Sequence, residues 1–438
     1  MGSDFFTTTI GEQLTLQRGF DITKKEQMAG DVPVVSSGGI SSYHNLAKAT
    51  APGVVLGRKG SLGTVYFLKE DYWPHDTSLW VKDFKGNNPR FVYYFFEGMA
   101  SELKKMDVGA ANPALNRNHV HLLKTKWPSI YIQNKIAEIA SSLDDKITHN
   151  RQINQTLEQM AQALFKSWFV DFDPVLDNAL DAGFFEQELD LPDELLRRAE
   201  ARQVVRQRPD FKPLPDATRQ LFPAAFEACP EPSLGLGGWV PTGWQVSTTG
   251  DEFTVKGGST PSTANPEFWD DGDIHWTSPK DLSGNPNKIL LRTERKITAT
   301  GLEKISSGLL PLETVLMSSR APVGYLAITK TPTAINQGYI AITKTKHLSQ
   351  EFTLYWLDSK IEMIKSLSGG TTFAEISKKT FRTIPIVVPA PPAVDFASKI
   401  IRSYLEKIGS NAEECRQLDE LRNYLLPKLI SGEIEVIS

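Results

Sequence analysis

Two short loops carry an arginine among small residues, a combination suited to binding nucleic acid. One loop reads GRKGSLG over residues 57–63, and the other reads SSRAPVG over residues 318–324. Small residues let a phosphate approach the backbone, and the arginine fork donates paired hydrogen bonds to phosphate or guanine. An ordinary turn with a solvated cation would have the same composition. The candidate contacts in these loops are Arg58, Lys59, Ser61, Ser319 and Arg320.

A second pair of loops, over residues 109–119 and 369–380, is rich in amide, hydroxyl and cationic side chains. Such side chains suit base edges and phosphates, although a plain solvated loop is an alternative. From these loops we select Asn116, Arg117, Asn118, Thr371, Thr372, Ser377, Lys378 and Lys379. Isolated cations add Lys24, Lys25, Lys256 and Lys280.

No motif in the chain supplies the reactive groups of a DNA-modifying enzyme. The string nearest to an adenine methyltransferase motif is NPAL at residues 112–115, which lacks the second proline and the aromatic residue. The GxxxxGK(S/T), HExxH and GxSxG motifs are all missing from the sequence. His119 and His121 alternate as strand residues would, and we expect them on a surface. We therefore expect no catalytic residue, no metal site and no cofactor bound by this chain.

The composition is typical of a folded cytoplasmic protein. Of the 438 residues 40% are hydrophobic, and no apolar stretch approaches the roughly 20 residues of a membrane helix. The N-terminus lacks a basic region followed by an apolar core, so we expect no signal peptide. Two isolated cysteines, Cys229 and Cys415, predict neither a disulfide framework nor a metal site, and favour the cytoplasm.

The net charge of −4 by itself counts against a lone DNA-binding domain. The charge is uneven, however, because residues 171–200 hold ten acidic side chains and two arginines. This stretch offsets basic surfaces elsewhere, so net charge does not exclude a nucleic-acid partner.

The loops selected above lie at matched positions of an internal repeat. At an offset of 261 residues Gly63 falls on Gly324 and Phe91 on Phe352, and the offset holds without a gap to about Asp171. A single offset over so long a stretch argues against chance resemblance.

Upstream of Gly63 the two copies drift apart. The string GEQLTLQRG at residues 11–19 resembles GDEFTVKGG at residues 250–258, at an offset of 239. The second copy therefore holds about 22 extra residues, which we place around residues 265–291. Two binding modules with a shared scaffold and different targets would show this pattern.

Each copy begins with a mixed α/β (α+β) domain, over residues 1–130 and 239–390. Short β-type runs separated by Gly, Pro, Ser and Asn clusters lead into a helical stretch. In the first domain we expect strands at residues 33–35, 54–56, 64–68 and 79–81 and a helix at residues 91–105.

A long helix follows each domain, over residues 131–170 and 391–432. Apolar residues recur at steps of three and four, which marks one helix face. At about 1.5 Å per residue, about 35 residues span roughly 50 Å, and a face that long needs a long partner. We expect the two helices to form an antiparallel coiled pair with pseudo-two-fold symmetry. The alternative is that each helix lies on its own domain.

Between the copies, residues 171–238 are rich in acidic residues, Pro and Gly, and most of this segment is interpreted as a crossover linker. We expect one short helix in it, at residues 192–206. Residues 433–438 form a C-terminal tail.

This organisation resembles the specificity subunit of type I restriction–modification systems. The similar strings are ALFKSWFVDF at residues 163–172, LLPKLISGEI at 425–434 and PTGW at 241–244. The resemblance covers essentially the whole chain.

The resemblance implies that each α/β domain is a target recognition domain for one half of a bipartite, asymmetric double-stranded DNA target. The helix pair would set the gap and dock two modification subunits, which bring S-adenosylmethionine. Two restriction subunits would supply ATP- and Mg-dependent translocation and cleavage, so the chain would not be an enzyme by itself. The residues chosen for docking are Leu157, Leu164, Phe165, Trp168, Leu418, Leu425 and Leu429.

Two alternatives remain open at this stage. One is a protein–protein scaffold with two peptide-binding adaptor domains, and the other is a self-sufficient methyltransferase.

Overall fold

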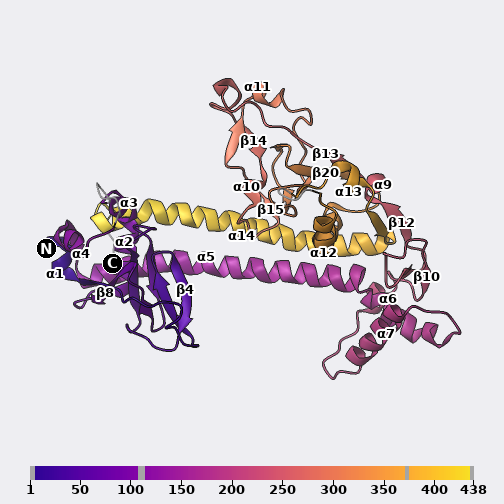
Figure 1. Cartoon of the computed structure of the whole chain (residues 1–438), viewed down its shortest axis with the longest axis horizontal. Helices are drawn as coiled ribbons and strands as arrows, with labels where there is room; N and C mark the ends of the chain where they lie inside the picture. Colours follow the sequence, from indigo (N-terminus) through magenta and orange to yellow (C-terminus); the bar gives the residue numbers. More distant parts are fainter. Residues whose placement is uncertain (1–4, 107–113, 370–373, 435–438) are drawn as a thin grey trace. The chain divides into compact units, whose positions relative to one another are not determined.

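The computed structural model describes residues 5–106, 114–369 and 374–434. Contacts divide the chain into two units, residues 1–149 with 414–438, and residues 150–413. Within its described residues, each unit contains one α/β domain and parts of both long helices (Figure 1).

In its described residues, the first α/β domain contains three small sheets. They have the strand orders β2-β8-β5-β6, β4-β3-β7 and β1-β9. The strands are β1 (Phe5–Thr9), β2 (Thr15–Arg18), β3 (Val32–Ser36), β4 (Gly39–His44), β5 (Gly53–Gly57), β6 (Val65–Leu68), β7 (Trp73–Pro74), β8 (Ser78–Asp83) and β9 (Lys124–Pro128). The helices are α1 (Ile10–Gln13), α2 (Pro89–Gly98), α3 (Ala100–Lys105) and α4 (Arg117–Leu122).

The second α/β domain repeats this plan with one more strand. Its sheets have the orders β13-β20-β17-β18-β15, β16-β14-β19 and β12-β21. The strands are β12 (Gln245–Thr248), β13 (Phe253–Lys256), β14 (Ile274–Thr277), β15 (Ile289–Leu290), β16 (Arg295–Ile297), β17 (Val315–Ser318), β18 (Leu326–Thr329), β19 (Ala334–Ile335), β20 (Tyr339–Thr345) and β21 (Pro385–Val388). The helices are α9 (Thr249–Glu252), η3 (Pro266–Phe268), α10 (Pro279–Leu282), α11 (Ala299–Leu302), α12 (Gln350–Ser366) and α13 (Lys378–Arg382).

The offset of 261 residues in the sequence is also an offset between hydrogen bonds. The Leu115 N–H donates to the Arg58 carbonyl oxygen at 2.9 Å, and the Ile376 N–H donates to the Ser319 carbonyl oxygen at 3.0 Å. Both members of each pair are displaced by the same offset, so the domains share a backbone frame.

The upstream offset of 239 is confirmed in the same way. The Ile10 N–H donates to the Leu123 carbonyl oxygen at 3.1 Å, and the Thr249 N–H donates to the Ile384 carbonyl oxygen at 2.9 Å. The first partner of each bond shifts by 239 residues and the second by 261, as the sequence comparison requires.

The position of the extra residues differs from the expectation. Val35 of β3 pairs with Pro74, and Thr277 of β14 pairs with Ile335, so the offset at this strand is 242. Most of the insertion therefore follows β14, over residues 278–314, and the placement around residues 265–291 was only partly right. The inserted segment contains β15, which extends the sheet by pairing parallel to β18.

The long helices are α5 (Ile130–Phe165), continued by the π-helical turn η1 (Lys166–Val170), and α14 (Pro391–Ser431). Their 36 and 41 residues correspond to about 54 and 62 Å at about 1.5 Å per residue. Within residues 1–149 and 414–438, Lys146 of α5 forms an ion pair with Glu414 at 3.5 Å, and Arg422 forms one with Asp144. The order of these pairs is antiparallel, as predicted.

The same antiparallel pairing occurs within residues 150–413. The Asn411 Nδ2 atom donates to Asn154 Oδ1 at 2.8 Å, and Asn154 Nδ2 donates to the Ile408 carbonyl oxygen at 3.1 Å. Nearer the end of α5, the rings of Trp168 and Phe396 stack with centroids 6.1 Å apart.

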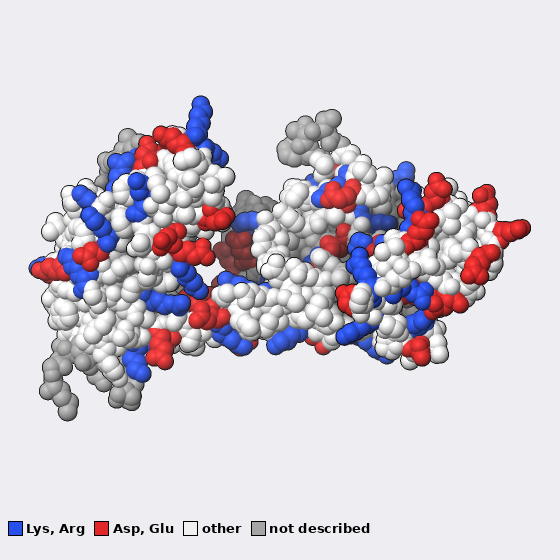
Figure 2. Space-filling view, turned by 90° about the horizontal axis from the view of Figure 1, so that it is seen from below, with Lys and Arg blue, Asp and Glu red and all other residues white. Residues whose placement is uncertain are grey.

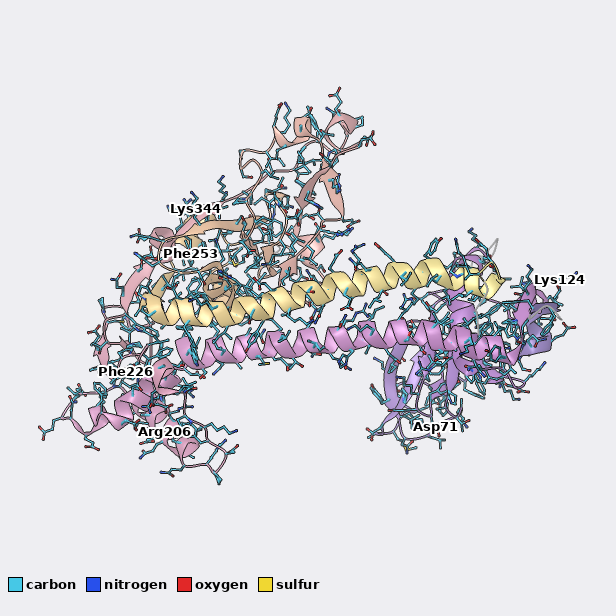
Figure 3. The ribbon with its side chains drawn as sticks, turned by 180° about the vertical axis from the view of Figure 1, so that it is seen from behind. Asp71, Lys124, Arg206, Phe226, Phe253 and Lys344 are labelled. Atoms are coloured by element: carbon cyan, nitrogen blue, oxygen red, sulfur yellow. The ribbon has the colours of Figure 1, made fainter. Side chains whose placement is uncertain are left out.

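Residues 171–238, expected to be mostly linker, fold as a small helical lobe that packs on the core of the second unit. Its helices are α6 (Asp173–Asp181), η2 (Phe184–Glu186), α7 (Asp193–Arg206) and α8 (Asp216–Arg219), and its strand β10 (Phe226–Ala228) pairs with β11 (Trp239–Pro241), which directly follows the lobe. The helix expected at residues 192–206 is α7. Phe172, Leu176, Leu195 and Phe226 are buried, and Figure 3 shows Phe226 and Arg206 in the lobe.

Ion pairs neutralise much of the acidic charge of this lobe. Three aspartates of α6 at four-residue spacing face three arginines of α7 at the same spacing, so each pair lies one helical turn from the next. The pairs are Asp173–Arg198, Asp177–Arg202 and Asp181–Arg206.

In the described part of the chain, no helix combines the length and the apolar character needed to cross a membrane.

Candidate nucleic-acid interface

The first arginine loop connects β5 to β6 and is tied to the segments on both sides. The Arg58 N–H donates to the Thr77 carbonyl oxygen at 2.9 Å, in the turn between β7 and β8. Lys59 forms an isolated bridge with Ala114, just before α4. The structure therefore brings together the two loops that the sequence singled out separately.

Glycine shapes this loop. A Cβ atom on Gly57 would lie 2.0 Å from the Ser61 carbonyl oxygen, and Gly63 has a φ of +73°. Both positions therefore exclude a side chain, and the tight turn presents Ser61 as an exposed residue.

Arg58 points toward the β7–β8 turn. Its Nη1 atom donates to the Asp76 carbonyl oxygen at 3.3 Å. Burial and the charge of Arg18 lower the pKa of the Arg58 guanidinium, and the charge of Asp76 partly offsets this. Arg58 and Lys59 are both half-buried, so each keeps part of its cationic surface open.

The second arginine loop connects β17 to β18 with the same frame. The Ser319 N–H donates to the Gly338 carbonyl oxygen at 2.8 Å, and Arg320 bridges to Glu375. Ser319 is only 3% exposed, so its hydroxyl lies beneath the surface and does not support the predicted contact. Arg320 is half-buried, and its Nη1 atom lies 3.8 Å from Glu375 Oε2.

The neighbouring helices begin with residues that the sequence had selected as contacts. Asn116 caps α4 by accepting a hydrogen bond from the Asn118 N–H at 3.0 Å. Ser377 caps α13 by accepting from the Thr380 N–H at 3.0 Å. These two side chains therefore position the exposed residues that follow them. Those residues are Arg117, Asn118, Lys378 and Lys379.

The remaining selected residues differ in their surroundings. Lys24 and Lys25 are exposed in a turn. Lys256 donates to the Ser307 carbonyl oxygen at 3.3 Å, and Lys280 forms an ion pair with Glu294 at 3.0 Å. Thr371 and Thr372 lie outside the described residues. His119 and His121 lie in the helix α4, so the strand suggested by their alternation was wrong, whereas His119 is exposed as expected and His121 is half-buried.

The sequence reasoning missed Arg18 and Asp76. The Arg18 Nη2 atom lies 2.8 Å from Asp76 Oδ2, directly beside the first arginine loop. One signal was available, because Arg18 lies in the string that defines the upstream repeat and is replaced by Gly257 in the second copy.

One group of described residues has the spacing of metal ligands. Ligand atoms of Asp21, His75 and Asp76 lie within 4.8 Å of one another. Arg18 already binds the Asp76 carboxylate, and a cation held there would have to compete with it. The group therefore provides no support for a metal site.

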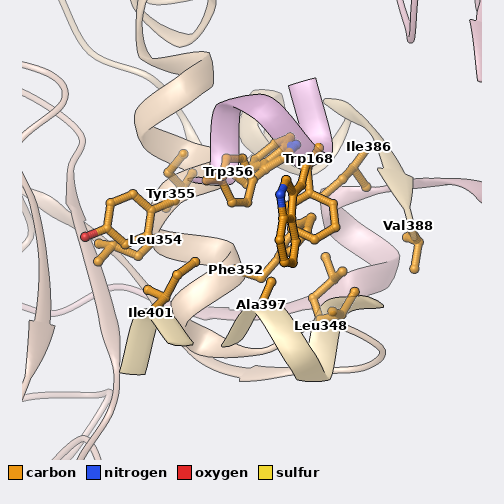
Figure 4. Close-up of a cluster of buried hydrophobic side chains, with 14 of the residues drawn as sticks. Trp168, Leu348, Phe352, Leu354, Tyr355, Trp356, Ile386, Val388, Ala397 and Ile401 are labelled. Atoms are coloured by element: carbon orange, nitrogen blue, oxygen red, sulfur yellow. The ribbon is translucent and has the colours of Figure 1, made fainter. Parts of the chain in front are cut away.

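Three of the residues selected for docking lie in the cores of their own units. Phe165 is 2% exposed, Trp168 6% and Leu429 5%, and Figure 4 shows Trp168 among Phe352 and Ala397. A buried side chain adds no contact area to a partner unless its core opens. The partly buried members are Leu157, Leu164, Leu418 and Leu425. Other apolar side chains on these helices are exposed, among them Met160, Leu421 and Tyr424.

Cationic side chains are mixed with acidic ones on the face seen in Figure 2. Among the described residues, this face therefore shows no broad, purely basic patch.

Two α/β domains with a common frame, different loop residues and one long helix each define a protein that presents two distinct recognition surfaces. The family model for the type I restriction modification DNA specificity domain matches residues 3–159 and 241–423. The chain belongs to this family, which recognises DNA targets, and the peptide-binding scaffold is not favoured.

Relatives agree with this assignment. The chain is 33% identical over 338 residues to the type I restriction enzyme HindI specificity subunit of Haemophilus influenzae, covering 74% of this chain and 71% of the relative. It is 35% identical over 185 residues to the MjaIX specificity subunit of Methanocaldococcus jannaschii, covering 42% of each.

Among solved structures, the type I restriction-modification S subunit from M. genitalium has a TM-score of 0.61. The match covers 99% of this chain and 97% of that one, at 13% identity, and shows that the fold is shared. Two domains joined by long antiparallel helices are thus the fold of this chain. Specificity subunits are non-catalytic components. The partners of this chain are DNA and the other subunits of a type I restriction–modification system.

Proposed function

We propose that each α/β domain reads one half of a bipartite, asymmetric DNA target. One observation carries the proposal: both domains tie an arginine loop to the segment before a short helix by the same hydrogen bond, yet fill these loops with different side chains. A conserved frame with variable ends can change the bases it reads while keeping its position on the duplex. The boundaries between recognition domains, long helices and connecting segment, at residues 130, 170, 238 and 390, are part of this proposal.

The long helices would set the length of the unread gap and dock two modification subunits. We propose that the exposed apolar residues Met160, Leu421 and Tyr424 take part in this docking, since their side chains are accessible at the helix surface. The two modification subunits would bind S-adenosylmethionine, and the two restriction subunits would bind ATP and Mg. A cytoplasmic location remains a prediction.

The test uses the complex of this chain with its modification subunits. Arg58→Ala and Arg320→Ala should each weaken binding to a cognate duplex by about 1–3 kcal/mol if the arginine reads a base, or should lower the salt slope by about 1 if it contacts a phosphate. Gel shifts over a salt series measure both quantities.

Matched controls are Lys82→Ala and Lys344→Ala. Lys82 and Lys344 are exposed cations of β8 and β20. Each of these strands follows the turn to which an arginine loop is hydrogen-bonded. Both control variants should bind DNA as the wild type does. If the wild-type complex binds random and cognate duplexes equally at moderate salt, the proposed function is wrong.

A further inference from the structure

Arg18 is an exposed arginine held by a largely buried carboxylate. It ends strand β2, and its Nη2 atom lies 2.8 Å from Asp76 Oδ2. The Arg18 side chain is 52% exposed and that of Asp76 is 19% exposed. The carboxylate therefore fixes one side of the guanidinium, while the exposed remainder is left to meet a ligand.

The surroundings of Asp76 favour its ionised form. Its Oδ1 atom lies 3.1 Å from His75 Nδ1, which accepts a hydrogen bond from the Thr77 N–H at 3.3 Å. Burial raises the pKa of the Asp76 carboxyl, but the hydrogen bond from Arg18 and the charges of His75, Arg18 and Lys59 outweigh burial and lower that pKa. The carboxylate is thus ionised at neutral pH and keeps its hold on Arg18.

This pair lies within the candidate interface. The Asp76 carbonyl oxygen accepts a hydrogen bond from Arg58 Nη1 at 3.3 Å, and the next residue, Thr77, binds the Arg58 N–H. The Asp76 carboxylate places a negative charge beside Arg18, Arg58 and Lys59. This negative charge weakens the attraction of the site for a phosphate, because like charges repel. It favours base reading, because a guanine contact requires the arginine fork in one fixed orientation.

The second domain lacks this pair at the equivalent positions. The offsets of 239 and 261 place Gly257 at the position of Arg18 and Gln337 at that of Asp76. Gln337 is exposed, and its Oε1 atom accepts a hydrogen bond from Thr260 Oγ1 at 2.8 Å. The space beside Gly257 holds the Lys378 Nζ atom, 2.2 Å from where a Cβ would lie. The two domains therefore present different chemistry at one shared position.

We propose that Arg18, positioned by Asp76, reads a guanine in the half-target of the first domain and thereby helps to distinguish the two half-targets. The inference rests on the proposed function, and it adds a specificity-determining residue and the base that this residue recognises.

The experiment selects bound duplexes from a random pool, using the complete complex with its modification subunits, and sequences them. The wild type should select a split motif. Arg18→Gln should lose about 10- to 100-fold of the preference for guanine at one position of one half, and leave the other half unchanged. Asp76→Asn should reduce the preference at that same position, because the arginine loses its fixed orientation. Lys82→Gln is the control and should select the wild-type motif.

Each result separates the two proposals. If the wild type selects no motif, the proposed function fails. If Arg18→Gln weakens binding to all duplexes equally and keeps the motif, Arg18 contacts phosphate, so this inference fails and the proposed function stands. If Arg18→Gln does not fold, Arg18→Lys keeps the charge beside Asp76 without the fork. A folded Arg18→Lys complex that selects the unchanged motif overturns the inference.

Discussion

The two α/β domains share a backbone frame but differ in the side chain that ends the first strand of the main sheet. Their frames agree down to single hydrogen bonds, and Gly63 and Gly324 both have positive φ, +73° and +109°, at equivalent positions. At the end of β2, however, the first domain has Arg18 where the second has Gly257. The Arg18 backbone pairs with Leu79 of β8 while its side chain is exposed, so a different side chain at this position can change the recognised bases without changing the fold.

The domains also anchor to the long helix α5 in related but different ways. Tyr94 donates to Asp144 at 2.7 Å, and the equivalent Tyr355 donates to Glu158 at 2.8 Å. In the second domain Lys288, from the inserted segment, adds an ion pair with Glu158 at 2.6 Å. The insertion therefore strengthens the packing of its own domain in addition to adding a strand.

The largest effects should come from the shared frame. Phe91 and Phe352 occupy equivalent positions and are 0% and 2% exposed. Phe91→Ala and Phe352→Ala should each lower the free energy of unfolding of their own unit by about 3–5 kcal/mol, because each leaves a cavity. Hydrogen exchange followed by mass spectrometry on the full chain in a urea series measures both units separately.

Phe6→Ala provides the control, since Phe6 is 49% exposed. A change of less than about 1 kcal/mol for either core variant would contradict the equivalence of the two frames.

The tyrosine anchors should give intermediate effects. Tyr94→Phe and Tyr355→Phe should each cost about 1.5–3 kcal/mol, because each removes a hydrogen bond to a carboxylate that is only partly exposed. Burial and the nearby carboxylate raise the pKa of both tyrosines, so each remains a donor at neutral pH.

Protection of α2 and α12 against hydrogen exchange measures the loss. Tyr43→Phe, at a residue that is 55% exposed, should change nothing. If both anchor variants behave like this control, the tyrosine hydrogen bonds contribute no stability, and the cationic partners of the two carboxylates are sufficient.

The smallest effect should be a pH dependence confined to the first domain's α4. Burial, and then the charges of Arg117 and Lys85, lower the pKa of His121, whose Nε2 atom accepts a hydrogen bond from the Leu16 N–H at 2.9 Å. As the pH falls, His121 takes up a proton at about pH 6.5 in the unfolded chain, but only at a lower pH in the folded chain. The stability of this region is therefore complete above about pH 6.5 and falls as the pH drops below it.

Exchange rates of the peptides covering β2 and α4, at pH values between 7.5 and 5.5 and corrected for intrinsic exchange, measure this dependence. His121→Gln keeps an acceptor that does not titrate, so it should flatten the dependence. An equal pH dependence in wild type and variant would rule out His121 as its source.

The sequence predicted the elements whose signals are local. The strand expected at residues 54–56 is β5, Gly53–Gly57, and the helix expected at residues 192–206 is α7, Asp193–Arg206. His119 and His121 misled because alternation over three residues is too short to separate a strand from one turn of helix. The acidic lobe was taken for a linker, although its aspartates and arginines both recur every four residues.

By itself, the sequence determined the repeat, its two offsets and the apolar faces of the long helices, because periodicity and matched spacing are properties of the chain alone. Only the tertiary structure decided what covers those faces. It buried Phe165 and Trp168 in a core where docking residues had been expected. It also joined Arg18 to Asp76 across 58 residues, because β2 pairs antiparallel with β8 and Asp76 lies in the turn just before β8. Contacts between such distant residues depend on how the sheets are arranged, and no local pattern records that arrangement.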